Sequence, residues 1–222
     1  MKVNRRSQVD RSAATRAALV AAARPLFAKR GFGRVGTETI VQAAGVTRGA
    51  LYHQFADKAE LFEAVYEAVE EDLTRSLGRR IAAAGASDPI EVMMLGAEAW
   101  LDACAEPEVQ QIVLLDGPVV LGWQRWRDIG LRYGLGLVEG MLAHAIEVGR
   151  IPPQPVSALA HVLVGALDEA GLYIARSEDQ AAASEETRAV IARLVAGLAD
   201  KSGDNPRVAG SDPAQGVRPD TA

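Results

Sequence analysis

The chain has 222 residues, of which 49% are apolar, so it is long enough to bury a core in one large or two small domains. One cysteine, Cys104, excludes an internal disulfide framework and fits a reducing cytoplasm. The net charge of −5 hides an asymmetry: residues 1–58 contain 11 Lys and Arg against 3 Asp and Glu, whereas residues 59–222 contain 13 against 26. A basic end beside an acidic remainder fits a protein that docks end-on to DNA, with a chance clustering of solvated charges as the alternative.

The sequence contains no pattern typical of export or of membrane insertion. The N-terminus is polar and lacks the apolar stretch of a secretory signal. The longest apolar stretch, around Ile112 to Trp123, is interrupted by Asp116, Gly117 and Pro118 and is too short to span a bilayer. We therefore expect a cytoplasmic protein without a membrane partner.

The first part of the chain predicts a basic arm followed by a helix. Residues 1–12 carry four basic side chains without apolar periodicity, so we expect a flexible arm that follows phosphates or enters a minor groove, or else a solvated terminus. From Ala13 to Arg30 apolar residues recur at helical spacing, and Gly31 ends the predicted helix. Pro25 lies inside it and predicts a kink near Ala21, because proline removes one backbone hydrogen bond.

Residues 37–55, TETIVQAAGVTRGALYHQF, predict two short helices joined by a tight turn. The first begins near Thr37 and ends at Gly45, because glycine readily takes the left-handed conformation of a helix C-terminus. Thr47 then acts as the N-cap of a second helix, about 48–55. Such a pair can lay its second helix into the major groove of DNA, although helical hairpins also occur in plain bundles.

The surrounding residues resemble the N-terminal domain of the tetracycline-repressor-like (TetR) family of bacterial transcriptional regulators. The matching features are Gly31-Phe32, Ala44-Gly45-Val46, Thr47-Arg48-Gly49, Leu51-Tyr52, Phe55, and Lys58 before Leu61-Phe62. The resemblance is dense over roughly residues 13–65 and loose afterwards. It implies an all-α protein with a three-helix, helix-turn-helix DNA-binding domain over 13–60 and a larger C-terminal helical domain for ligand sensing and dimerisation over 61–200.

Two positions depart from the family's pattern. Pro25 is one, and the other is Val35-Gly36, where family members often carry Thr or Ser that cap the next helix and touch phosphate. Thr37 remains for that capping, so we expect the first helix of the pair to be weakly capped.

The rest of the chain predicts further helices. Asp57 and Glu60 form a capping box for a long helix that reaches about Ala84 and connects the two domains. Later helices are expected over 89–104, 107–115, 120–148, 156–176 and 185–199, with Asp116-Gly117-Pro118 ending the second of these. Residues 201–222 are rich in Gly, Pro and Asp and are expected to be a disordered tail.

Helix 156–176 is apolar on nearly every side, so we expect a partner subunit to cover it. Together with helix 185–199, and the same two helices of a second chain, it would make a four-helix bundle. The resemblance implies the same homodimer interface, because TetR-like proteins use their last two long helices for it. The expected interface residues are Leu159, Leu163, Leu167, Ile191, Leu194 and Leu198.

The expected DNA contacts lie near helix N-termini. They are Thr37, Thr47, Arg48, Gly49, Tyr52, His53 and Lys58. Arg48 could read guanine through a bidentate pair, with a plain phosphate contact as the alternative. Gly49 allows close approach of the backbone, and Tyr52 and His53 would touch phosphate or a thymine methyl, unless the tyrosine is core and the histidine solvated. A twofold dimer implies a near-palindromic operator in double-stranded DNA.

Family members typically bind a small molecule in the C-terminal domain, and the connecting helix then tilts. Candidates for the lining of such a pocket are Met93, Met94, Trp100, Trp123, Trp126 and Tyr133, with room left by Gly130, Gly134, Gly136 and Gly140. Ordinary core or dimer contacts are the alternative, because aromatic and Met residues at helical spacing are usually core. This lining suggests an apolar effector.

Other classes of function have little support in the sequence. There is no Gly-rich phosphate loop or nucleophile elbow, no cofactor is implied, and His53, His144 and His161 lack the spacing of metal ligands. We interpret His144 and Glu147 as a surface pair. We therefore expect a repressor, because repression is the commoner mode of the family, rather than an enzyme. A TetR-like activator and a non-specific architectural DNA-binding protein are the alternatives.

Overall fold

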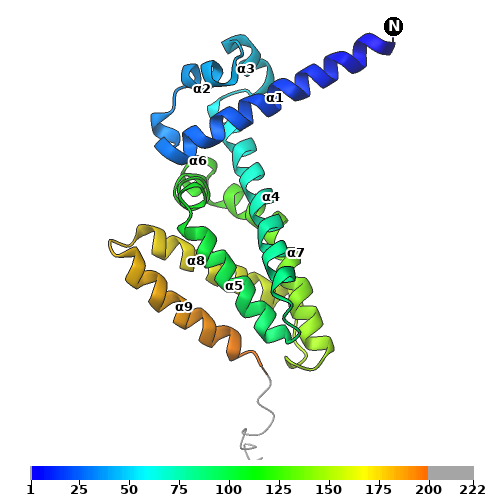
Figure 1. Ribbon diagram of the computed structural model, residues 1–222, viewed down its shortest axis with the longest axis vertical. Coiled ribbons are helices and arrows are strands. Elements are labelled where there is room, and N and C mark those ends of the chain that lie inside the picture. Colours follow the sequence, from blue (N-terminus) through cyan, green and yellow to red (C-terminus); the bar gives the residue numbers. More distant parts are fainter. Residues whose placement is uncertain (1, 200–222) are drawn as a thin grey trace, which may run out of the picture.

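Helices account for all the regular structure of residues 2–199, which the computed structural model describes (Figure 1). The α-helices are α1 (Lys2–Arg30), α2 (Thr37–Ala44), α3 (Arg48–Gln54), α4 (Lys58–Ala84), α5 (Pro89–Ala105), α6 (Gly117–Leu121), α7 (Trp123–Glu147), α8 (Val156–Arg176) and α9 (Gln180–Ala196). Two short segments join them, the 3-10 turn η1 (Phe32–Arg34) and the π-helix η2 (Val109–Asp116). The predicted all-α fold class is confirmed, and the tail predicted for 201–222 lies outside the described residues.

Helices α1 to α3 form a small domain at one end, and α4 leads from it into the helical body (Figure 1). Helix α1 starts at Lys2, so residues 2–12 are helical and the expectation of a flexible arm is corrected. That segment contains neither Gly nor Pro, so its backbone carries no residue that breaks the helix. The same helix continues through Pro25 to Arg30.

An aromatic cluster holds the small domain to α4. The rings of Phe27, Phe32 and Phe62 pack against one another with centroids 5.3 to 5.7 Å apart. Phe27 and Phe62 are fully buried. Such contacts contribute about 0.5–1.5 kcal/mol per pair beyond the area that they bury. The small domain is therefore anchored to the first turns of α4 by aromatic packing.

The start of α4 is capped as the sequence predicts. Asp57 accepts a hydrogen bond from the Glu60 N–H at 2.8 Å, and the Glu60 carboxylate accepts one from the Ala56 N–H at 2.6 Å. Asp88 caps α5 in the same way by accepting from the Ile90 N–H. These caps satisfy backbone donors that a helix N-terminus leaves without partners.

The chain breaks at Gly122 and not at Asp116-Gly117-Pro118, where the sequence suggested an end. The π-helix η2 passes directly into α6, and α6 ends at Gly122, whose φ of 77° and ψ of 153° are readily available only to glycine. A proline in the first turn of a helix does not interrupt it, which explains why Pro118 does not end the segment. Helix α7 therefore begins at Trp123 and not near Val120.

Gly117 lets three elements meet closely. A Cβ at this position would lie 2.8 Å from the Trp126 ring and 3.1 Å from the Tyr66 ring. The Trp126 indole N–H donates to the Val113 carbonyl at 2.8 Å, which ties α7 to η2. The missing side chain therefore allows η2 and α6 to rest against α4 and α7.

Helix α8 has the length and apolar composition of a membrane span, which the sequence analysis did not anticipate. In the folded chain it packs against α5, α7, α9 and η2, as a core helix does. Only a third of its most apolar stretch is buried inside the chain, so the expected cover by a partner subunit stays a prediction. Its exposed apolar residues include Val162 and Tyr173.

Candidate functional site

The α2–α3 pair has the geometry that the sequence predicts. Gly45 takes the left-handed conformation, with φ 65° and ψ 29°, and ends α2. The Thr47 hydroxyl accepts a hydrogen bond from the Ala50 N–H at 3.2 Å and so caps α3. Gly36 is the N-cap of α2 and supplies no side-chain bond, which confirms weak capping there. Thr37 is the first residue of α2 and not its cap.

Helix α3 buries one side and exposes the other. Leu51 and Phe55 are fully buried and Ala50 is half-buried. The exposed residues are Thr47, Arg48, Gly49, Tyr52 and His53, and no heavy atom outside the adjacent cap lies near the place of a Gly49 side chain. The exposed side therefore offers polar and cationic groups together with a stretch of accessible backbone.

Arg48 and Tyr52, one helical turn apart, are organised together. The Arg48 guanidinium carbon lies 5.5 Å from the centroid of the Tyr52 ring. Hydrogen bonds with Arg48, and then with Thr37, lower the pKa of the Tyr52 phenol below its usual value. Three of the predicted DNA-contacting side chains therefore form one network that bridges the start of α2 and the exposed face of α3. The predicted alternative of a core tyrosine does not apply, because Tyr52 is 45% exposed.

Helix α1 supports α3 from behind. The Arg16 guanidinium lies 4.2 Å above the Phe55 ring and donates to the Gln54 carbonyl at 3.3 Å. The Ser12 hydroxyl accepts a hydrogen bond from the Gln54 side-chain amide at 2.8 Å. The domain boundary that we expected between residues 12 and 13 therefore falls within a helix that packs on α3. These supports could not be located from sequence periodicity, because both basic and small polar residues look like surface positions.

Lys58 has a structural position that differs from the predicted phosphate contact. Its ammonium donates to the carbonyls of Phe32 and Val35 at 2.8 and 2.9 Å and lies 3.9 Å from the centroid of the Phe32 ring. Two of its three donors are thus engaged within the protein. We therefore assign Lys58 to holding η1 against α4, and its predicted contact with DNA stays a prediction.

Polar contacts also join the small domain to η2. The Asp116 carboxylate accepts a hydrogen bond from the Phe32 N–H at 2.7 Å. Arg24 of α1 forms a bidentate pair with Glu108 at 2.7 and 2.8 Å and also bonds to Asp72 of α4 at 2.6 Å. The small domain is therefore attached to two separate elements of the body.

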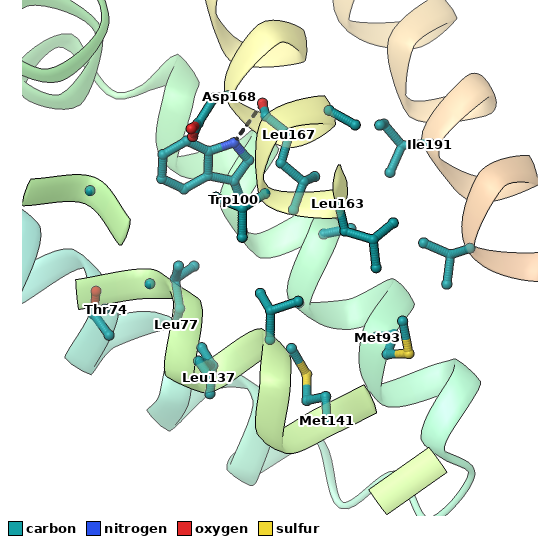
Figure 2. Close-up of a pocket in the computed structure, with 18 of the residues that line it drawn as sticks. Thr74, Leu77, Met93, Trp100, Leu137, Met141, Leu163, Leu167, Asp168 and Ile191 are labelled. Atoms are coloured by element: carbon teal, nitrogen blue, oxygen red, sulfur yellow. Dashed lines mark hydrogen bonds between the residues drawn. The ribbon is translucent and has the colours of Figure 1, made fainter. Parts of the chain in front are cut away.

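The body contains an apolar pocket between α4, α5, α7, α8 and α9, with a volume of about 110 Å³ (Figure 2). Its walls include Leu73, Leu77, Met93, Trp100, Leu137, Met141, Leu163, Leu167 and Ile191. Gly130 and Gly134 of α7 also line it, as the glycine pattern suggested. The Trp100 indole N–H is satisfied by the Leu167 carbonyl at 3.0 Å, so the ring is fixed in the wall (Figure 2).

Of the six predicted lining residues, Met93 and Trp100 line this pocket. Met94 and Tyr133 are half-buried against the core, Trp126 lies beneath Gly117, and Trp123 is 59% exposed. The prediction is therefore wrong for these four. Trp126 packs beneath Gly117 and donates to the Val113 carbonyl, so contacts with η2 and α6 hold it in the core beside the pocket.

Two carboxylates that were not expected from the sequence, Glu70 and Asp168, also line the pocket. Glu70 of α4 is 5% exposed, and burial raises its pKa to about 7 although its hydrogen bond with Tyr66 acts in the opposite direction. Burial also raises the pKa of Asp168 to about 6, while its ion pair with Arg127 lowers it. The sequence signal was available: Glu70 interrupts the buried stripe of α4, and Asp168 interrupts the apolar run of α8.

The predicted interface residues mostly face the chain's own core. Ile191 is buried, and Leu159, Leu163, Leu167 and Leu198 pack against the core between α5, α7, α8 and α9. Only Leu194 of the predicted set is about half exposed. The other large exposed apolar residues of these two helices are Val162, Tyr173 and Val190. Leu194 is thus the most exposed of the expected set, the other leucines remain partly exposed, and the interface itself stays a prediction.

An exposed α3, supported by α1 and joined through α4 to a hollow helical body, defines a helix-turn-helix transcription regulator. Family models of this class of regulator match both the N-terminal and the C-terminal part of the chain. Residues 19–65 match the model described as bacterial regulatory proteins of the tetR family, and residues 90–198 match the tetracyclin repressor-like C-terminal domain.

Relatives and solved structures are consistent with this class. A crystal structure of a TetR-family transcriptional regulator from Pectobacterium atrosepticum is 33% identical, with a TM-score of 0.78 over 86% of this chain and 97% of that one. The CymR regulator of Pseudomonas putida is 32% identical over 61% of this chain and 63% of its own length. The transposon Tn10 TetC protein of Escherichia coli is 25% identical over 73% and 81%. The chain belongs to the TetR family of bacterial transcriptional regulators.

Proposed function

We propose that this regulator is a homodimeric, cytoplasmic repressor that binds a near-palindromic operator through α3 and is released by a small, largely apolar effector. The observation that carries the proposal is the exposed Arg48–Tyr52–Thr37 network on α3, a helix whose opposite side is buried and supported by α1. A preorganised guanidinium suits bidentate recognition of guanine, which contributes about 1–3 kcal/mol of discrimination. The pocket in the body supports the effector part of the proposal.

The test is binding of the purified protein to DNA from just upstream of its own gene, at two salt concentrations and with random competitor DNA. We expect tight binding that survives the competitor and is weakened about 5- to 150-fold by Arg48→Ala, the range that corresponds to a bidentate base contact. Arg79→Ala removes an exposed arginine of α4, far from α3, and should bind like the wild type. Equal loss of binding to all sequences in excess competitor would instead identify an architectural DNA-binding protein.

The dimer part of the proposal uses the exposed apolar residues of α8 and α9. Val162, Tyr173, Val190 and Leu194 lie on these neighbouring helices, and a second copy of the chain would remove them from water. We expect sedimentation analysis to show a dimer that the double variant Val162→Glu, Val190→Glu converts to a monomer. Val148→Glu, a similarly exposed valine after α7, is the matched control and should remain dimeric. A monomeric wild type would refute this arrangement.

A further inference from the structure

Apart from Thr74, the polar lining of the pocket lies at one end, which we call the acidic end and define by Glu70 and Asp168. Figure 2 shows Asp168 beside Trp100 at this end, while Met93 and Met141 lie at the opposite end. A carboxylate inside an apolar cavity is costly unless a cation or hydrogen-bond donors compensate for the lost hydration. The acidic end is therefore the part of the pocket where a ligand's polar group would be bound.

The two carboxylates differ in their partners. Asp168 forms an ion pair with Arg127 of α7, so its charge is balanced. Glu70 has only the Tyr66 phenol as a side-chain hydrogen-bond partner, and no cationic side chain of the described residues is among the groups that set its pKa. When Glu70 is ionised, the acidic end thus carries one negative charge in excess.

Gly130 of α7 lies opposite Glu70 and leaves the space next to its carboxylate without a side chain. A Cβ at Gly130 would lie 4.0 Å from a Glu70 carboxylate oxygen and 3.9 Å from the Tyr66 hydroxyl. Gly134, one turn further along α7, has no heavy atom within 4 Å of the place of a Cβ. These two glycines cost about 1 kcal/mol each relative to alanine in a helix interior. The space in front of the carboxylate is therefore kept at the expense of helix stability.

We propose that the pocket binds a small hydrophobic cation, a branched alkylammonium ion smaller than benzene, whose ammonium donates hydrogen bonds to Glu70. The cation balances the excess charge, the apolar walls contact the alkyl group, and the Trp100 ring supplies an additional attraction for positive charge. The volume of about 110 Å³ sets this size limit, since apolar cavities of about 150 Å³ in proteins hold a benzene molecule. The inference rests on the proposed function, because it names the effector class for the same pocket.

Binding of a cation requires the ionised form of Glu70. The titratable or charged groups around this carboxylate are Tyr66 of α4, Asp168 of α8, and Arg127 and Tyr133 of α7, together with Cys104 of α5. Burial raises the pKa of the Cys104 thiol, so it stays neutral near pH 7. With the pKa of Glu70 at about 7 in the free protein, the ionised fraction rises about tenfold from pH 6 to pH 8, whereas an alkylammonium ion stays protonated throughout.

The experiment is isothermal titration calorimetry of the full chain with three probes of one shape. They share one isopropyl group and are isopropylamine, which is cationic, 2-propanol, which is neutral, and isobutyrate, which is anionic. We expect the amine to bind at least tenfold more tightly than the other two at pH 8. Its affinity should fall about tenfold at pH 6, while the affinity for the alcohol should not change.

Two variants test whether Glu70 causes the preference for the amine and its pH dependence. Glu70→Gln keeps the shape of the side chain and should remove both the preference for the amine and its pH dependence, while the alcohol still binds. Glu71→Gln is the matched control, since it removes a carboxylate from the exposed side of the same helix, and it should behave like the wild type. If Glu70→Gln does not fold, the comparison of the three probes with the wild type at both pH values still decides the question.

Three results would overturn the proposal: the alcohol or the carboxylate binding the wild type as tightly as the amine, a pH-independent affinity for the amine, or no binding of any probe at millimolar concentration. Tightest binding of isobutyrate would identify Arg127 as the anchor. A measurement of operator binding in the same preparation distinguishes a wrong effector class from a wrong regulator assignment. If DNA binding is specific and the probes show no preference, the effector class is wrong and the regulator assignment stands. If DNA binding is absent, the proposed function fails independently of the pocket.

Discussion

The exposed face of α3 and the acidic end of the pocket both depend on charged side chains, but in opposite surroundings. Arg48 lies in water, where a charge is solvated at little cost, and it is available to a partner because nothing covers it. Glu70 lies in an apolar cavity, where an unbalanced charge is costly. On a protein surface a single charge therefore indicates little until its neighbours are known, whereas the same charge inside an apolar wall already indicates a ligand or a proton.

The largest expected effect tests how strongly the small domain that carries α3 depends on its packing against α4, the helix that also lines the pocket. Phe62→Ala removes the ring that contacts both Phe27 and Phe32, and it should lower the free energy of unfolding by about 3–5 kcal/mol. Urea denaturation followed by circular dichroism measures it. The exposed Val119→Ala should change stability by less than about 0.5 kcal/mol. A loss below about 1 kcal/mol for Phe62→Ala would show that the small domain does not depend on this cluster.

The second prediction concerns the buried charge alone. The pKa of Glu70 is raised from 4.5 to about 7 on folding, so the folded state binds the proton more tightly and the free energy of unfolding falls as the pH rises from about 4.5 to about 7. Glu70→Gln lacks this titration. The wild type should therefore lose up to about 3 kcal/mol relative to Glu70→Gln between pH 5 and pH 8.

Urea denaturation of both proteins at the two pH values measures this difference. Asp168 titrates in the same direction but is present in both proteins, so its contribution cancels to first order. A difference in stability that does not change with pH would mean that water or a counter-ion already compensates Glu70.

The third prediction compares two glycines. Gly117→Ala brings a Cβ to within 2.8 Å of the Trp126 ring and should lower the free energy of unfolding by about 1–3 kcal/mol. Gly134→Ala meets no atom within 4 Å and should raise it by up to about 1 kcal/mol, since alanine is the better helix former. Thermal unfolding of the pair checks the opposite signs. Equal effects would contradict the distinction between a packing glycine and a pocket glycine.

The smallest effect tests the caps of the α2–α3 pair. Thr47→Ala removes the hydroxyl that accepts from the Ala50 N–H and should cost about 1 kcal/mol. Thr37→Ala should cost less, because Gly36 and not Thr37 occupies the cap of α2. Both are measured by urea denaturation, and a larger loss for Thr37→Ala would reverse this assignment.

Local signals in the sequence located the helix-turn-helix pair well. Gly45 and Thr47 determine where α2 ends and α3 begins through their own backbone and side-chain chemistry, and Asp57 and Asp88 do the same for α4 and α5. Each of these signals acts within four residues, so no knowledge of the tertiary structure is needed. The boundaries of α8 were predictable for a related reason, since Pro155 directly precedes it.

The pocket was less predictable because it depends on how separate helices are aligned. Trp126 packs under η2 and α6 and does not line the pocket, and only the tertiary contacts with Gly117 and the Val113 carbonyl decide this. Likewise, α8 and α9 each have apolar residues on two sides, and periodicity cannot say which side meets the chain's own core. The expected interface therefore contained Ile191, which is buried, and omitted Val190, its exposed neighbour.

One core cluster extends from Leu19 in α1 through Phe62 and Tyr66 in α4 to Leu172 in α8. The DNA-binding end therefore has no core of its own, and it should unfold together with the upper part of the body in a single cooperative transition. A fragment that stops at Lys58 would leave Phe27 without Phe62 and η1 without Asp116. In this chain the helix-turn-helix is consequently not an independent module that could be excised and transferred to another protein, because its fold is completed by the body that it serves.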